Sequence, residues 1–70
     1  MATKKHLIIT GISSISWKDA TLKAISEVSK TIDYISDVKI LEQRANILNN
    51  QITEYFVDID LSFTVDENRN

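Results

Sequence analysis

The chain has 70 residues and no cysteine, which excludes a disulfide framework, a thiolate zinc site and a redox thiol. Its formal net charge of −2 argues against nucleic acid as a partner, because nucleic-acid-binding domains carry a basic face. This length predicts one domain, 1–70, with a core so small that oligomerisation or a ligand is expected to support it.

The first predicted element is a strand over residues 4–10, where β-branched side chains dominate. Its alternation places Leu7 and Ile9 on one face and Ile8 on the other. We expect Gly11 to end this strand, and a connection through residues 12–15 to follow it.

An amphipathic helix is predicted to begin after Ser16. The Ser16 hydroxyl can accept a hydrogen bond from the backbone N–H of Asp19, and the Asp19 carboxylate can bond back toward the cap. Ile15 and Ala20 have the spacing of a hydrophobic staple. Apolar residues then recur every three or four positions over roughly four turns, a stripe made of Trp17, Ala20, Ala24, Ile25, Val28, Thr31, Ile32 and Ile35.

Residues 37–48 are predicted to form a second strand whose alternation changes phase. One parity holds Val38 and Ile40, and the other holds Leu41, Ala45 and Ile47. A β-bulge within residues 41–44 explains this change, because one extra residue shifts every later side chain to the other face. The pair Asn49-Asn50 then favours a tight hairpin, since asparagine tolerates the left-handed conformation.

Strict alternation over residues 55–65 predicts a third, antiparallel strand with one buried face. The buried face is expected to hold Tyr55, Val57, Ile59, Leu61, Phe63 and Val65. The charged tail 66–70 is expected to fray. The element order is therefore β-α-β-β, an α+β domain with a three-stranded antiparallel sheet and one helix.

Neither a targeting signal nor a membrane span is predicted. The apolar run after Lys5 covers only residues 7–9, which is shorter than a signal peptide requires, and nothing approaches the roughly 20 apolar residues of a membrane span. We therefore expect a cytoplasmic protein without a membrane partner.

The sheet is expected to assemble with other copies of the chain. A three-stranded sheet has two edges, and the chain has no proline to protect them. Phe56 is predicted to stand alone among carboxylates and hydroxyls on the outward face, where a large aromatic ring usually marks a contact. A symmetric homo-oligomer is the expected state.

The charged and aromatic residues allow more than one interpretation. Asp58 and Asp60 share a strand face about 7 Å apart and could provide oxygen ligands for calcium, or simply form a solvated acidic face. Trp17 could stack on a ligand or cover the core at the start of the helix. No catalytic set or phosphate-binding loop is present in the sequence, so we do not expect an enzyme.

Four stretches together give the chain a specific resemblance. They are KKHLIITGIS, ISWKDATLKAISEVSKTI, VKILEQRANI and QITEYFVDIDLSFTVDE. In this order the chain resembles the dodecins, small β-α-β-β proteins that assemble into hollow shells, many of which bind flavins. The resemblance implies a sheet partly wrapped around the helix and a homododecamer.

The resemblance also implies a ligand site that includes Asp37, Gln43, Arg44 and Phe56. The flavin-stacking tryptophan of the family aligns with Asp37, and its flavin-binding glutamine aligns with Phe56. Arg44 lies where some relatives place a basic residue near the phosphate-bearing tail of the flavin. Because both recognition groups are replaced, we expect weak or absent binding of riboflavin or FMN. The alternative is a non-flavin shell that is structural or binds calcium.

Overall fold

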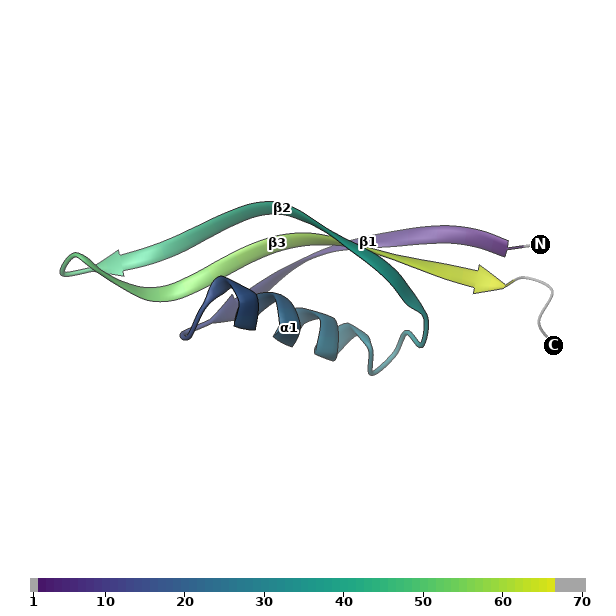
Figure 1. The fold of residues 1–70 in the computed structure, drawn as a ribbon, viewed down its shortest axis with the longest axis horizontal. Coiled ribbons are helices and arrows are strands. Elements are labelled where there is room, and N and C mark those ends of the chain that lie inside the picture. Colours follow the sequence, from purple (N-terminus) through teal and green to yellow (C-terminus); the bar gives the residue numbers. More distant parts are fainter. Residues whose placement is uncertain (1, 67–70) are drawn as a thin grey trace.

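The computed structural model describes residues 2–66, which form three strands and one helix (Figure 1). The elements are β1 (Ala2–Ser13), α1 (Trp17–Val28), β2 (Ile35–Leu48) and β3 (Gln51–Asp66). All pairing is antiparallel, and β3 lies between β1 and β2 in a sheet that arches over α1. This confirms the predicted β-α-β-β order. Beyond residue 66, the predicted tail lies outside the described residues.

The core lies between the middle strand and the helix. Val57, Ile59 and Leu61 of β3 are fully buried and pack against Ala20 and Ala24 of α1. This confirms the centre of the buried face predicted from the alternation, because β3 has neighbours on both sides and the helix beneath it. Toward the ends of the strand, Tyr55, Phe63 and Val65 are only partly buried. The partly buried residues around this core are Ile9, Trp17, Ile25, Val28 and Ile35.

The helix begins where the capping pattern predicts. Ser16 is the N-cap, and its Oγ accepts a hydrogen bond of 2.9 Å from the backbone N–H of Asp19. The Asp19 carboxylate does not bond back to the cap but accepts from the Ser13 hydroxyl at 2.6 Å. The predicted staple is also absent, since Ile15 remains 67% exposed.

The helix is shorter than predicted and ends at Val28. The backbone N–H groups of Thr31 and Ile32 both donate to the Val28 carbonyl at 3.0 Å, which closes a turn instead of another helical repeat. Ile35 then begins β2 and pairs with Phe63. β-Branched side chains at these positions fit a strand or turn at least as well as a helix, so their helical spacing was misleading.

Gly11 lies inside β1 and does not end it, so that prediction is wrong. It pairs with Val57, and the strand continues to Ser13. A Cβ atom at this position would overlap the Ala20 carbonyl oxygen and lie 3.1 Å from the Ala24 Cβ. Glycine is therefore needed so that α1 can approach the sheet closely.

The predicted bulge and hairpin turn of β2 are both confirmed. The register shifts between Ile40 and Glu42, which leaves Leu41 without a partner on β3. Asn49 and Asn50 have φ values of 54° and 63°, the left-handed pair required by a two-residue hairpin. Within residues 2–66, no helix has the length and apolar character needed to span a membrane.

Candidate functional site

The face of the sheet turned away from α1, here called the outer face, collects most of the predicted site residues. Cross-strand rows place Thr10, Asp58 and Glu42 side by side, followed by Ile12, Phe56 and Arg44. Of the predicted residues, the outer face holds Asp37, Arg44, Phe56, Asp58 and Asp60.

Arg44 connects the charged part of the outer face to its aromatic ring. Its Nε lies 3.0 Å from a carboxylate oxygen of Glu42, and its NH2 group lies 3.1 Å from one of Asp58. The guanidinium carbon also lies 5.4 Å from the centre of the Phe56 ring, within the range of a cation–π contact. Phe56 is therefore half-buried beneath a cation and beside Ile12. The prediction that it stands alone on this face is wrong.

Asp58 is held as a carboxylate by neutral and charged donors. The Thr10 hydroxyl donates to it at 2.8 Å, and Arg44 donates to the same oxygen at 3.1 Å. The hydrogen bond from Thr10, followed by the hydrogen bond and positive charge of Arg44, lowers the pKa of Asp58 below its ordinary value. Thr10 was not identified from the sequence; its position opposite Asp58 follows only from the register of β1 and β3.

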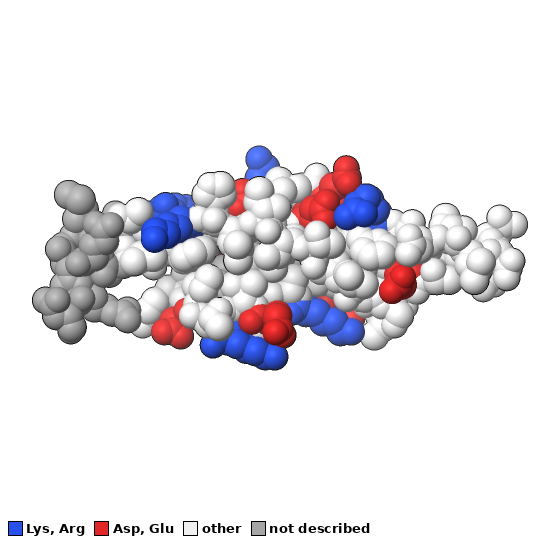
Figure 2. All heavy atoms as spheres, turned by 180° about the vertical axis from the view of Figure 1, so that it is seen from behind, with Lys and Arg blue, Asp and Glu red and all other residues white. Residues whose placement is uncertain are grey.

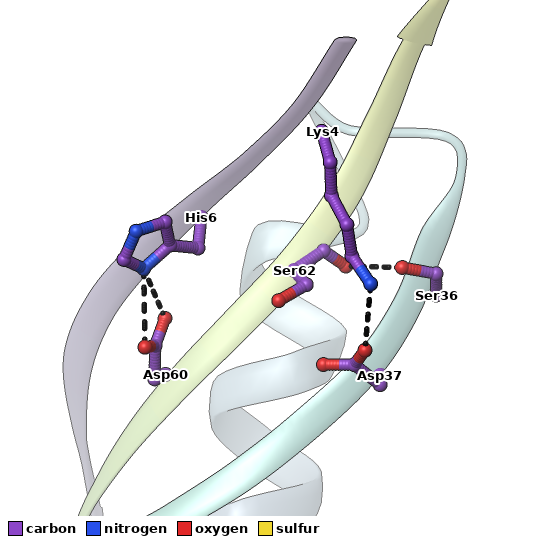
Figure 3. A network of polar contacts seen from close by, with 6 residues as sticks. All are labelled: Lys4, His6, Ser36, Asp37, Asp60 and Ser62. Atoms are coloured by element: carbon purple, nitrogen blue, oxygen red, sulfur yellow. Dashed lines mark hydrogen bonds and ion pairs between the residues drawn. The ribbon is translucent and has the colours of Figure 1, made fainter. Parts of the chain in front are cut away.

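A second group of polar contacts lies further along the outer face (Figure 3). The His6 Nδ1 lies 2.9 and 3.1 Å from the two carboxylate oxygens of Asp60. The Lys4 ammonium donates to Asp37 at 3.2 Å, and hydrogen bonds from Lys4 and then Ser62 lower the pKa of Asp37. Asp37 thus has a cation as its neighbour and offers no aromatic surface.

Asp58 and Asp60 share the outer face as predicted but have separate partners. Asp58 contacts Thr10 and Arg44, whereas Asp60 contacts His6. Across residues 2–66, no three histidine, aspartate or glutamate side chains gather closely enough to hold a metal ion. A calcium ion at Asp58 or Asp60 would therefore need further oxygen ligands from elsewhere.

Gln43 is separated from the other predicted site residues. Its register partner is the fully buried Val57, so Gln43 belongs to the face that carries α1. The cause is the position of the bulge at Leu41, which sets the parity of all later residues in β2. The structure thus brings Arg44, Phe56 and Asp58 together and leaves Gln43 on the opposite side of the sheet.

Trp17 links the helix to the strand that carries Arg44. Its indole Nε1 donates a 2.9 Å hydrogen bond to the Arg44 backbone carbonyl. Its ring meets Tyr55 edge-on, with ring centres 4.9 Å apart and an interplanar angle of 79°. Trp17 therefore packs beside the core, and its bond to Arg44 is a contact that the sequence did not indicate.

A separate cleft of about 380 Å³ lies where the connection after α1 meets the end of β3. It contains none of the predicted site residues and is lined by Thr31, Ile32, Asp33, Tyr34, Phe63, Thr64 and Val65.

Comparisons with known proteins agree on one family. The family model described as Dodecin matches residues 3–66, whereas a search of curated proteins finds no match. Among solved structures, the chain is similar to the dodecin of Streptomyces coelicolor, with 21% identity, coverage of 94% of each chain and a TM-score of 0.88. It is similar to the dodecin of Streptomyces davaonensis at 24% identity, covering 94% of this chain and 97% of that one, with a TM-score of 0.87.

A third similar structure is the calcium dodecin of Mycobacterium tuberculosis, described as calcium-chelating. Its identity to this chain is 23%, the coverage is 97% of each chain, and the TM-score is 0.80. The TM-scores of these three structures establish a shared fold, and the family match spans nearly all of the described residues. The chain belongs to the dodecin family.

Proposed function

We propose that the chain is the subunit of a homododecameric shell that binds and stores a small planar ligand of the flavin class. The observation that carries this proposal is the large apolar surface that a single chain leaves in solvent. The proposed role is binding and not catalysis, and we place the shell in the cytoplasm on the sequence grounds given above.

The exposed apolar side chains exceed what one subunit can use for its own core. Only five apolar side chains are buried in the described chain, while the subunit extends over 55 × 19 × 12 Å. Isolated soluble chains rarely expose large apolar surfaces, so contact with other copies is the supported explanation. The exposed large apolar residues are Leu7, Ile8, Ile12, Ile15, Leu22, Tyr34, Val38, Ile40, Leu41, Ile47, Leu48 and Ile52.

The hairpin that joins β2 to β3 concentrates this apolar surface. Ile47 and Leu48, which lie between the last register shift of β2 and the turn, are 66% and 64% exposed, and residues 45–53 contain no charged side chain. Figure 2 shows the uncharged end of the molecule that this hairpin forms. An arm of this kind is suited to burial against a neighbouring subunit.

The contact between Arg44 and Phe56 supports the proposal of a planar ligand on the outer face. The guanidinium lies over the Phe56 ring, so this pair presents a flat surface that carries a positive charge. Asp37, in contrast, supplies no stacking surface. These features favour a flavin bound more weakly than at a site with a stacking tryptophan.

Flavin fluorescence tests the ligand directly. Titration of the purified oligomer into riboflavin or FMN is expected to quench flavin fluorescence, with saturation only at high protein concentration. Arg44→Gln should weaken FMN binding, while Lys18→Gln, which removes an exposed cation from α1, serves as the control. The absence of quenching by the wild-type protein at any concentration would contradict the flavin proposal.

A calcium-binding shell is the second candidate, favoured by the likeness to the calcium dodecin and by Asp58 and Asp60 on one face. Calcium would then raise the melting temperature in a concentration-dependent manner, because it binds only the folded state. The double substitution Asp58→Asn, Asp60→Asn should abolish that rise. A calcium effect no larger than that of sodium chloride at equal ionic strength would exclude this candidate.

A further inference from the structure

The contact between Trp17 and Arg44 points to a role for the helix in the ligand face. We propose that Trp17 is a positioning residue, which holds the Arg44 guanidinium over Phe56 and thereby makes the outer face prefer ligands that carry a phosphate or a similar anionic group. The ligand part of this inference rests on the proposed function, because it concerns the same face.

Arg44 lies in a part of the sheet that has few other supports. β2 is an edge strand and pairs only with β3. The bulge at Leu41 interrupts that pairing three residues before Arg44, and α1 packs mainly against β1 and β3. Edge strands and bulges are the places where a backbone is least constrained by its ladder. A hydrogen bond to the Arg44 carbonyl therefore restricts the backbone of β2 at a position where the sheet itself restricts it least.

The anchor itself is rigid. Trp17 is the first residue of α1, directly after the Ser16 cap, and its side chain is half-buried against the core. The edge-on contact with Tyr55 fixes the plane of the indole, so its N–H points in one direction. The 2.9 Å hydrogen bond from the Trp17 Nε1 therefore fixes the Arg44 backbone of β2 relative to the start of α1.

A fixed Arg44 backbone matters because the side chain must satisfy three partners at once. The guanidinium contacts Glu42 at 3.0 Å, Asp58 at 3.1 Å and the Phe56 ring at 5.4 Å. These partners lie in two adjacent cross-strand rows of the sheet, so a shift of the Arg44 backbone would break at least one of the contacts. Because Arg44 remains about half exposed, its fork of N–H donors can also reach a bound anion such as a phosphate.

The experiment compares three substitutions in the full-length oligomer. Trp17→Phe keeps an aromatic ring near Tyr55 but removes the indole N–H, and Arg44→Gln removes the guanidinium itself. Val28→Ala is the matched control, because it disturbs the packing of α1 on the core at the opposite end of the helix and leaves the Trp17 N–H and its contact with Tyr55 in place. Trp17→Tyr offers a second substitution without the indole N–H if Trp17→Phe does not assemble.

Two measurements separate positioning from a general loss of stability. The first is the heteronuclear NOE of the Arg44 Nε–H group by NMR, which reports how firmly the guanidinium is held beside Glu42 and Asp58. The second is the ratio of the affinities for FMN and riboflavin, which differ by a phosphate. A purely structural defect would weaken both flavins alike and leave their ratio unchanged.

We expect Trp17→Phe to lower the heteronuclear NOE of the Arg44 Nε–H group, because the guanidinium is then held less firmly. Trp17→Phe and Arg44→Gln should both reduce the preference for FMN by about fivefold, the size of a modest exposed ion pair. Val28→Ala should leave both readouts as in the wild type. A Trp17→Phe protein with the wild-type heteronuclear NOE at Arg44 would overturn the positioning role. If neither flavin binds the wild type, the flavin proposal fails, and the heteronuclear NOE at Arg44 alone decides the role of Trp17.

Discussion

Asp19 joins β1 to α1 through its carboxylate. The Ser13 hydroxyl donates to it at 2.6 Å, and the Lys23 ammonium lies 3.3 Å away. The hydrogen bond from Ser13, followed by the interactions with Lys23, lowers the pKa of Asp19 below its ordinary value of 3.8. A carboxylate with a lowered folded-state pKa contributes stability above its unfolded pKa, and this contribution disappears as the pH falls through the folded-state pKa.

We therefore predict that Asp19→Asn melts at a lower temperature than the wild type at pH 7, and that the difference shrinks as the pH falls below about 4. Thermal melts followed by circular dichroism across this range provide the measurement. Asp33→Asn, at an exposed position after α1, is the matched control. A difference between Asp19→Asn and the wild type that stayed constant down to pH 2 would contradict the assignment.

Gly11 permits the closest approach between the helix and the sheet. Gly11→Ala introduces a Cβ that overlaps the Ala20 carbonyl oxygen, so α1 must move away from a core that is already packed. We predict a loss of about 1–3 kcal/mol in the free energy of unfolding, which is typical of overpacking. Urea unfolding provides the measurement, with Ser14→Ala as an exposed control on the same connection. Wild-type stability of Gly11→Ala would show that the helix does not need this contact.

An element could be predicted from the sequence when the residues that determine it lie close together in the chain. The alternation of β3 identified Val57, Ile59 and Leu61 as core, because a period of two is imposed by the pleat itself. The helix start followed from Ser16, whose capping bond spans only three residues. The end of the helix could not be predicted from the local spacing, because Ile35 pairs in the sheet with Phe63, which is distant in the sequence.

The candidate site was predicted only in part, for a similar reason. Arg44, Phe56 and Asp58 share one face because of the pleat and the register. The alternation placed Phe56 and Asp58 on that face, whereas Arg44 was added to the site only through the family resemblance. Gln43 was placed with them through the family resemblance, but the exact position of the bulge turns it to the other face. The bond from Trp17 to Arg44 joins two elements, and no sequence periodicity reports such a contact.

The β2–β3 turn depends on the backbone conformation of Asn50. Asn50 has φ of 63°, where a β-branched side chain is strongly disfavoured. Asn50→Val should therefore destabilise the subunit by about 1–2 kcal/mol, whereas Asn50→Gly should keep or raise its stability. Chemical unfolding of the two variants provides the comparison. Equal stability of Asn50→Val and Asn50→Gly would mean that the hairpin does not depend on this turn geometry.

Substitution of Phe56 tests whether the outer face is covered by other subunits or by a ligand. Phe56→Asp adds a carboxylate beside Glu54 and Asp58, on a face where Arg44 is already shared between two carboxylates. Burial of this charge without a partner would cost several kcal/mol, so the shell should break into smaller species while the subunit stays folded. Size-exclusion chromatography with circular dichroism measures both properties. Phe56→Leu should assemble normally, and an intact shell of Phe56→Asp would place the ring on an open surface.

In the proposed assembly, the subunit completes its burial only in a closed homo-oligomer. Sedimentation equilibrium of the wild-type protein measures the mass of the particle in solution without reference to its shape. For a chain of 8.0 kDa, we expect a single species of about 96 kDa, twelve copies in a closed symmetric particle. A stable, folded monomer of 8.0 kDa over the whole concentration range would contradict it.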